Sequence, residues 1–229
     1  MIAMAETRQN SVLDDVQRAL GRQTTLSPPP LEPFFEPAAR IDVRELVERF
    51  TQEATAVRAQ VHRVDDNHQL IEKIVGICRD QIGEVAISGA ELFRKTDLPG
   101  ELTARDFSTF IGEQADHGQM VARLANCGVG VTAADFAIAE TGTIVLSSDE
   151  PNALLVSLLP PVHIAVVRSE QMIATIDEAI RKTGSEQMAR ANPTRSVTLI
   201  TGPSRTSDVE LVLSIGVHGP KELHVIILD

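Results

Sequence analysis

Two short segments rich in glycine and hydroxyl residues stand out in the C-terminal half of the chain. The first runs from residue 134 to 146 (ADFAIAETGTIVL), the second from 201 to 210 (TGPSRTSDVE), and the loop sequence GVHGP follows at 216–220. Each segment places small, polar, turn-forming residues beside an apolar run that is typical of a strand. Backbone N–H groups at a glycine turn, together with hydroxyls and an arginine, form sites for anionic groups in α/β proteins. The segments therefore predict where a ligand binds, rather than which ligand.

The turn at residues 140–143 combines a carboxylate, two hydroxyls and a glycine. In a functional interpretation, Thr141, Gly142 and Thr143 form a cradle for an oxyanion or phosphate. Glu140 then acts as a general base, a nucleophile or an orienting group. The alternative is a tight turn that needs glycine at positive φ, with threonines suited to the flanking strands. The spacing alone favours the tight turn.

The second segment carries more chemistry. Gly202 follows a strand pattern, and Arg205 stands among hydroxyl residues with a fork of donors suited to carboxylate or phosphate. Ser207 or Asp208 could instead cap a helix, but a cap does not explain the arginine beside the hydroxyls. The segment contains neither a GxxxxGK[ST] loop nor a GxGxxG motif. We predict a site for a small carboxylate or phosphate-bearing ligand whose binding residues include Gly202, Ser204, Arg205, Thr206, Asp208 and Gly219.

Histidines offer a further candidate. His218 lies in a glycine- and proline-containing loop, which suits an acid/base or anion-contact role and equally suits a structural histidine. His163 and His224 lie inside strand patterns and are interpreted as buried histidines with satisfied hydrogen bonds. The histidines are dispersed and HExxH is absent, so their spacing assembles no metal site.

The two cysteines, Cys78 and Cys127, lie far apart and form no CxxC pair. A disulfide framework and a thiolate-bound cluster are therefore both unsupported. We expect this chain to bind no metal or cluster, and the sequence names no other cofactor.

Composition restricts the class of protein. With 43% hydrophobic residues in 229 and mean hydropathy near zero, the chain is long and apolar enough for a sizeable core. No apolar run approaches the roughly 20 residues of a membrane helix, and no secretory signal is evident, so we expect a soluble cytoplasmic protein. The formal net charge of −11 and the absence of Trp and Tyr argue against nucleic-acid binding.

The pattern along the chain predicts two regions. Residues 1–40 hold a helical pattern (10–22) and a connector with five prolines at 27–37, which together form an N-terminal helical arm. Residues 41–229 alternate between strand and helix patterns, which predicts an α/β domain with an open, mostly parallel sheet flanked by helices. We expect strands at 57–64, 85–88, 162–167, 197–201 and 223–228, a hairpin across 135–148, and helices around 46–50 and at 67–82, 117–126 and 170–182.

The ordered motifs ADFAIAETGT, PPVHIAVV (160–167), TGPSRTSDVE and GVHGP resemble the LUD-domain family, in its small members without cluster-binding cysteines. The match covers roughly the last 100 residues well. The resemblance implies a fold similar to the NagB/RpiA/CoA-transferase superfamily, with ligands at the carboxyl ends of the strands.

The resemblance also implies a role in growth on L-lactate, alongside an iron–sulfur oxidoreductase and a larger LUD-domain protein that carries cluster ligands. The leading hypothesis is an accessory subunit of this L-lactate-oxidising iron–sulfur system, with a retained anion pocket. The alternatives are a stand-alone transferase or isomerase of CoA-transferase-like fold that uses Glu140, or a sensor of a small ligand. A homo-oligomer is compatible with each of them.

Overall fold

The computed structural model describes residues 41–111, 117–147, 152–188, 196–207, 213–215 and 218–229, together with Ala19. The chain divides into two units, Met1–Pro37 and Ala38–Asp229, and the second holds every described residue except Ala19. Apart from Ala19, the predicted N-terminal helix and the proline-rich connector lie outside the described residues. Within the described part, no helix combines the length and the apolar character needed to cross a membrane.

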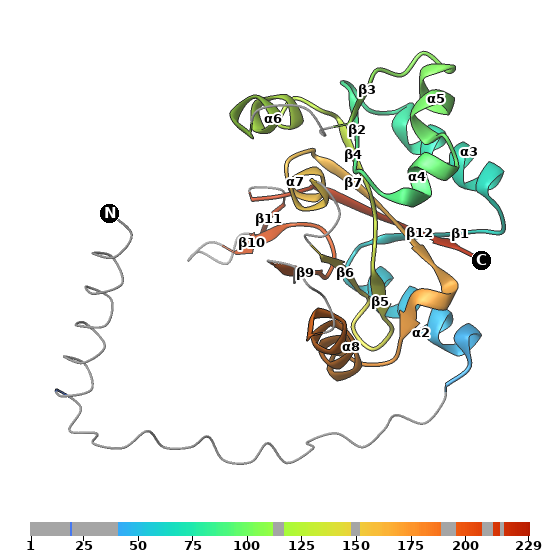
Figure 1. Cartoon of the computed structure of the whole chain (residues 1–229), viewed down its shortest axis with the longest axis vertical. Coiled ribbons are helices and arrows are strands. Elements are labelled where there is room, and N and C mark those ends of the chain that lie inside the picture. Colours follow the sequence, from blue (N-terminus) through green and yellow to red (C-terminus); the bar gives the residue numbers. More distant parts are fainter. Residues whose placement is uncertain are drawn as a thin grey trace. The chain divides into compact units, whose positions relative to one another are not determined.

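The second unit is built on a six-stranded sheet in the order β1-β12-β7-β4-β2-β3, with all neighbours parallel (Figure 1). This confirms the predicted α/β class with an open, mostly parallel sheet flanked by helices. The central strands β7 and β12 are apolar almost throughout, as is typical of strands buried on both faces. The strands are β1 (Gln60–Val64), β2 (Val85–Ile87), β3 (Thr109–Ile111), β4 (Val129–Ala133), β7 (Val162–Arg168) and β12 (Glu222–Leu228).

One face of this sheet is covered by α3 (Asn67–Cys78), α4 (Glu91–Lys95) and α5 (Leu98–Thr103). Helix α3 begins where the Asp66 carboxylate accepts a hydrogen bond of 2.8 Å from the Gln69 N–H. Its buried face packs on alternate residues of the strands, among them Ile164 and Ile226. This packing forms one of the apolar cores of the unit.

The other face is covered in two parts. Helices α6 (His117–Leu124) and α7 (Ala153–Leu158) pack over β2 and β3, whereas α2 (Val43–Ala56) and a second sheet pack over β7 and β12. The second sheet has the order β8-β5-β6-β9, and α8 (Ile176–Met188) packs on it through Ala179. Its strands are β5 (Phe136–Ile138), β6 (Thr143–Ser147), β8 (Met172–Ile173) and β9 (Val197–Ile200); β10 (Arg205–Ser207) and β11 (Leu213–Ile215) form a separate antiparallel pair.

Several predicted boundaries shift. The predicted strand at 57–64 begins only at Gln60, because residues 57–59 form the turn that closes α2 at Ala56. The predicted helix at 170–182 is wrong in its first part. A short 3-10 helix (Ser169–Gln171) comes first, and Met172 then enters β8 and pairs with Ala137 of β5. The strand β4 and the helix α7 were not predicted.

Two glycines hold the small sheet against the end of α2. Gly142 has φ 61° and Gly202 has φ 78°, the left-handed region that favours glycine. A Cβ at Gly142 would lie 2.2 Å from the Ala54 backbone nitrogen, and one at Gly202 would lie 2.5 Å from the Val57 carbonyl oxygen. Both turns therefore need glycine, for conformation and for close approach to α2.

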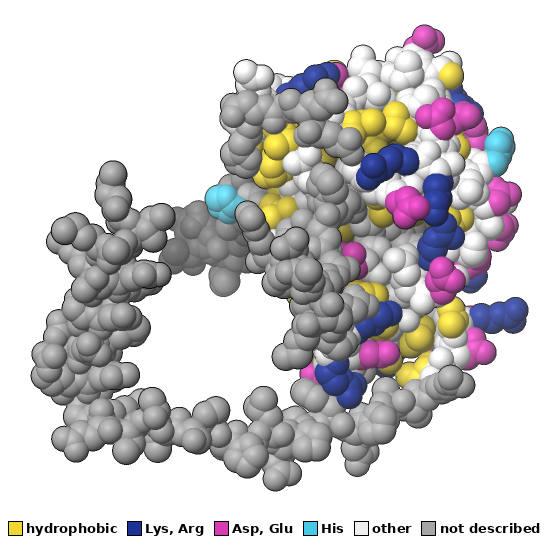
Figure 2. Space-filling model, viewed as in Figure 1, with side chains coloured by type: hydrophobic (Ala, Val, Ile, Leu, Met, Phe, Trp, Pro, Cys, Tyr) yellow, Lys and Arg dark blue, Asp and Glu magenta, His cyan; other side chains and the backbone are white. Residues whose placement is uncertain are grey.

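On the face shown in Figure 2, basic and acidic side chains are interspersed over the described part of the surface. They form no broad basic patch there of the kind that nucleic-acid binding requires.

We predict opposite effects for alanine at two glycines. Gly142→Ala should cost about 1–3 kcal/mol of folding stability, because it combines a strained φ with a backbone clash. Gly76→Ala in α3 should instead add about 0.5–1 kcal/mol, since its Cβ would meet no heavy atom within 4 Å and alanine favours a helix. Urea unfolding of both variants measures the effects, and equal stability would contradict the packing described for α2.

Candidate functional site

The second predicted segment and the 218–220 loop meet around a cavity of about 220 Å³. The cavity lies at the amino ends of β7 and β12, not at the carboxyl ends where the resemblance placed ligands. There the Ser204 N–H donates to the Pro220 carbonyl at 2.9 Å, which joins the two loops. The lining residues are Ser157, Leu158, His163, 198–204, 218–220 and Leu223.

His163 and Ser157 are buried polar residues of this cavity, and the Ser157 hydroxyl is already hydrogen-bonded to the Leu154 carbonyl. The side chain of His163 lies on β7, the residue is 1% exposed, and its Nε2 is 2.8 Å from the Thr132 hydroxyl of β4. Its Nδ1 has no hydrogen-bond partner. Burial lowers the pKa of His163 to about 3, so the imidazole is neutral at physiological pH. The expectation that this histidine is fully satisfied was therefore wrong for Nδ1.

A buried nitrogen without a hydrogen bond destabilises the fold, and a ligand that forms the missing hydrogen bond removes this penalty. If the Thr132 hydroxyl donates to Nε2, the Nδ1 of His163 carries the proton and can donate to a carboxylate. If Nε2 donates to Thr132, Nδ1 can accept from a ligand hydroxyl. Either tautomer therefore offers a complement to a small hydroxylated acid.

A chain of hydroxyls links the first predicted segment to this cavity. Thr141 Oγ1 donates to Thr143 Oγ1 at 2.7 Å, and Thr143 Oγ1 lies 2.7 Å from Thr201 Oγ1. When Thr143 donates onward, the hydroxyl proton of Thr201, which lines the cavity, remains available to a ligand. The predicted ligand residues Thr141 and Thr143 thus reach the cavity only through Thr201.

Glu140 does not line the cavity. Its Oε1 accepts a hydrogen bond of 2.7 Å from the Ile176 N–H, the first residue of α8. A carboxylate at a helix N-terminus is a stabilising arrangement, so the structure gives Glu140 a positioning role. Its catalytic role stays a prediction. Gly142, directly beyond in the same turn, faces the backbone of α2.

The remaining predicted residues divide in three groups. Gly202, Ser204, His218 and Gly219 line the cavity, and His218 is exposed. Arg205 follows Ser204 directly, is exposed, and begins β10 rather than a helix. Thr206 lies in β10, and Asp208 lies outside the described residues.

The carboxyl edge of the sheet carries a second unpaired buried atom, the Ser88 hydroxyl just after β2. The strand order reverses beside it, between β2 and β4, a position at which open α/β sheets bind ligands.

The thiols are poor nucleophile candidates. Burial raises the pKa of Cys78 to about 12 and, as the largest cause, that of Cys127 to about 11, so both are neutral thiols at physiological pH. Among the described residues, no group of three or more His, Cys, Asp or Glu side chains could hold a metal ion.

The family model of the LUD domain matches residues 47–228 of this chain. The chain belongs to the LUD domain family. It is similar to lactate utilization protein C of Macrococcus caseolyticus, with 33% identity over 136 residues, or 59% of this chain and 58% of that protein. It is also similar to lactate utilization protein C of Halalkalibacterium halodurans, with 25% identity over 100% of this chain and 99% of that protein.

One solved structure has the same fold. The crystal structure of a duf162 family protein from Deinococcus radiodurans matches with a TM-score of 0.61 and 22% identity, covering 83% of this chain and 100% of that chain. The match to the first relative spans little more than half the length of that protein.

We predict that acid weakens this fold through its buried histidines before its carboxylates titrate. Burial, with Lys73 and His224 nearby, lowers the pKa of His62 to about 4, and that of His163 is lowered to about 3. An unfolded histidine titrates near 6.5, so the unfolded state takes up protons first as pH falls. The contribution of each such histidine to the free energy of unfolding is therefore fully present above about pH 6.5. As the pH drops below about 6.5, the free energy of unfolding decreases by at most about 1.4 kcal/mol per pH unit for each of them.

Urea unfolding at intervals between pH 7.5 and 5 measures this slope. His163→Gln and His62→Gln should each flatten it. The exposed His68 provides the matched control, and His68→Gln should leave the slope as in the parent. A slope that His163→Gln does not change would contradict the neutral, buried state of His163.

Proposed function

We propose that this chain is an accessory subunit of an L-lactate-oxidising iron–sulfur system and that its cavity binds a small carboxylate. Membership of the LUD domain family and the names of two relatives support the role in lactate utilization. The observation that carries the cavity proposal is the unpaired Nδ1 of His163, in a cavity that also collects Ser204 and His218.

Size and charge fit the proposed ligand. A cavity of about 220 Å³ suits a small organic acid better than a nucleotide-sized cofactor. The protein carries a formal charge of −11, so an anion needs a local cation. Arg205, next to Ser204 at the start of β10, is the proposed counter-charge. The hydroxyl of Thr201 and the Nδ1 of His163 would complete the contacts.

L-lactate is the first ligand to test. Arg205→Ala should weaken its binding by about 1.5–3 kcal/mol, the loss of a charged hydrogen bond. Substitution of His163 by glutamine or by asparagine distinguishes the contributions of its two ring nitrogens to binding. In His163→Gln the amide takes the place of Nε2 near Thr132, and Nδ1 is lost. In His163→Asn the amide takes the place of Nδ1. We expect the glutamine variant to lose more affinity than the asparagine variant.

Calorimetric titration with L-lactate measures these affinities. Arg79→Ala, at the exposed end of α3, removes an arginine away from the cavity and should bind as the parent does. Unchanged affinity in both Arg205→Ala and His163→Gln would contradict this ligand site.

The proposed subunit role predicts stable partners. We expect the protein, purified anaerobically from native cells grown on lactate, to co-elute with iron–sulfur proteins in stoichiometric amounts. Mass spectrometry of the eluate and an iron assay measure this. An iron-free homo-oligomer would contradict the accessory role and favour a stand-alone enzyme or sensor.

A further inference from the structure

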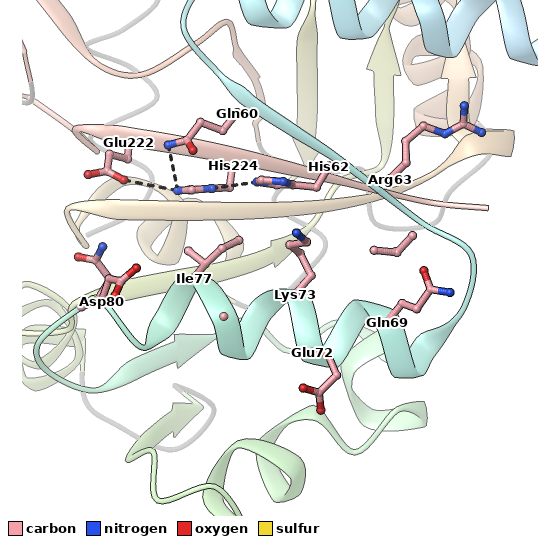
Figure 3. Close-up of a pocket in the computed structure, with 13 residues that line it drawn as sticks. Gln60, His62, Arg63, Gln69, Glu72, Lys73, Ile77, Asp80, Glu222 and His224 are labelled. Atoms are coloured by element: carbon pink, nitrogen blue, oxygen red, sulfur yellow. Dashed lines mark hydrogen bonds and ion pairs between the residues drawn. The ribbon is translucent and has the colours of Figure 1, made fainter.

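A larger polar cavity, of about 700 Å³, lies on the opposite face of the sheet from His163, between α3 and the edge of β1 and β12 (Figure 3). It shares no residue with the cavity described above. Strand β1 is the last strand of its sheet, so the cavity opens at the sheet edge. Its walls carry amide, imidazole, ammonium and carboxylate groups rather than a purely apolar surface.

Two histidines form the strand side of this cavity. His62 of β1 and His224 of β12 have nearly parallel rings, with centroids 5.5 Å apart and planes 11° apart. His62 Nε2 lies 3.2 Å from His224 Nδ1. Beyond the pair, His224 Nε2 lies 3.4 Å from both the Gln60 amide nitrogen and the Glu222 carboxylate. The parallel register holds the pair in place, since Gln60 lies opposite His224.

The two outer partners set opposite proton arrangements. The Glu222 carboxylate only accepts, so pairing with it puts a proton on His224 Nε2 and lets His62 Nε2 donate to His224. The amide nitrogen of Gln60 only donates, so pairing with it makes His224 donate to His62. His62 Nδ1 is then an acceptor in the first case and a donor in the second. The histidine pair can therefore present either a hydrogen-bond acceptor or a donor at His62 Nδ1 to a neighbouring group.

Gly76 opens the helix side of the cavity. It lies within α3, where glycine is unfavourable relative to alanine, yet a Cβ there would meet no heavy atom within 4 Å. Packing therefore does not require this glycine. Because Gly76 lines the cavity, its missing side chain leaves space in it.

Lys73 brings a charge that has no counter-ion among the described residues. In Figure 3 its ammonium points from α3 toward His62 and His224. It is half-buried and forms no hydrogen bond or ion pair with the rest of the described chain. Two neighbouring charges are already engaged, Arg63 with Asp229 at 2.7 Å and Glu72 with Arg105 at 2.8 Å. A half-buried ammonium beside two imidazoles is an incomplete anion site.

We propose that this cavity binds an oxyanion-bearing organic ligand, with the anionic group between Lys73 and His62. A single oxyanion fills only a small part of about 700 Å³. The remaining walls include the side-chain amides of Gln60 and Gln81, which suit hydroxyl groups, whereas the amide of Gln69 is engaged with Asp65. The ligand is therefore a hydroxylated phosphate or carboxylate rather than a bare inorganic ion.

Binding here is coupled to proton uptake. Burial, and to a smaller extent Lys73, lowers the pKa of both histidines, and an anion beside them acts in the opposite direction. The charged and titratable groups of the lining are His62 and Arg63 from β1, Glu72, Lys73 and Asp80 from α3 and the residues after it, and Glu222 and His224 from β12. Glu72 is paired with Arg105, and Glu222 contacts His224 Nε2, on the opposite side of the His224 ring from the nitrogen that faces His62, whereas the proposed anion lies between Lys73 and His62.

Histidine side-chain NMR tests the proposal on the full chain. Inorganic sulfate is the first probe, because its charge is constant over the titration range, and sodium chloride at equal ionic strength is its control. Sulfate should raise the pKa of His62 by about half a unit or more. Glycerol 3-phosphate should bind at least about tenfold more tightly than sulfate, since it also meets the amides. The same titration with acetate in place of sulfate distinguishes a carboxylate site, in which acetate also raises the pKa of His62, from a phosphate site.

Variants on α3 separate this site from unspecific salt effects. Lys73→Gln should abolish the sulfate effect, whereas Lys95→Gln, which removes an exposed lysine of α4 paired with Glu91, should keep it. Gly76→Leu should fill the cavity and block binding, and the smaller side chain of Gly76→Ala should weaken binding less than leucine does. Identical histidine titrations in sulfate and chloride would overturn the proposal, as would a sulfate effect that persists in both Lys73→Gln and Gly76→Leu.

Discussion

A parallel sheet whose two faces are both apolar must be covered on both sides, and the rest of this chain is arranged around that requirement. On one face α3, α4 and α5 supply the cover. On the other face the cover is divided between α6 and α7 at one end and α2 with the small sheet at the other. His163 lies where these two parts meet, at the amino end of β7. There its ring is buried, but the backbone of the neighbouring elements supplies no partner for Nδ1.

The end of α2 fixes the small sheet in this position. Gly142, in the turn between β5 and β6, and Gly202, after β9, both approach the backbone of its last turn and of Val57, closer than any Cβ would allow. Because β9 pairs with β6, the two contacts act on one unit. The Thr143–Thr201 hydroxyl pair lies between the same turns, so the geometry of the cavity follows from the packing on α2. The glycine of the 140–143 turn, which in the sequence suggests a phosphate cradle, therefore serves in the structure to contact α2.

The sequence predicted the elements whose pattern is local. Continuous apolar runs marked β7 and β12, and the turn at 141–142 marked the hairpin. The helix pattern that included Met172 failed because Met172, Ile176 and Ala179 fit a helical spacing, while pairing with Ala137 makes Met172 a strand residue. Most of the cavity residues of the 202–204 and 218–220 loops were predicted, since their types suit an anion. His163 was assigned a satisfied core role, because a lone histidine in a strand pattern does not reveal which nitrogen lacks a partner. The α3 cavity left no local signal, since Lys73, His62 and His224 meet only through the sheet register.

The two cavities lie on opposite faces of the same strands, and their histidines are electrostatic neighbours. His163 lies in register with Leu223, directly before His224 in the chain. Burial is the main cause of the lowered pKa of His163, and His224 is the second. An anion that promotes protonation of the His62–His224 pair places positive charge behind His163. That charge favours an anion in the His163 cavity and further disfavours protonation of His163 itself. The coupling is reciprocal by thermodynamic necessity, so a carboxylate beside His163 would favour the proton and the oxyanion on the far side of the sheet. A rigid sheet can therefore link two ligands through charge alone, without a change of backbone conformation.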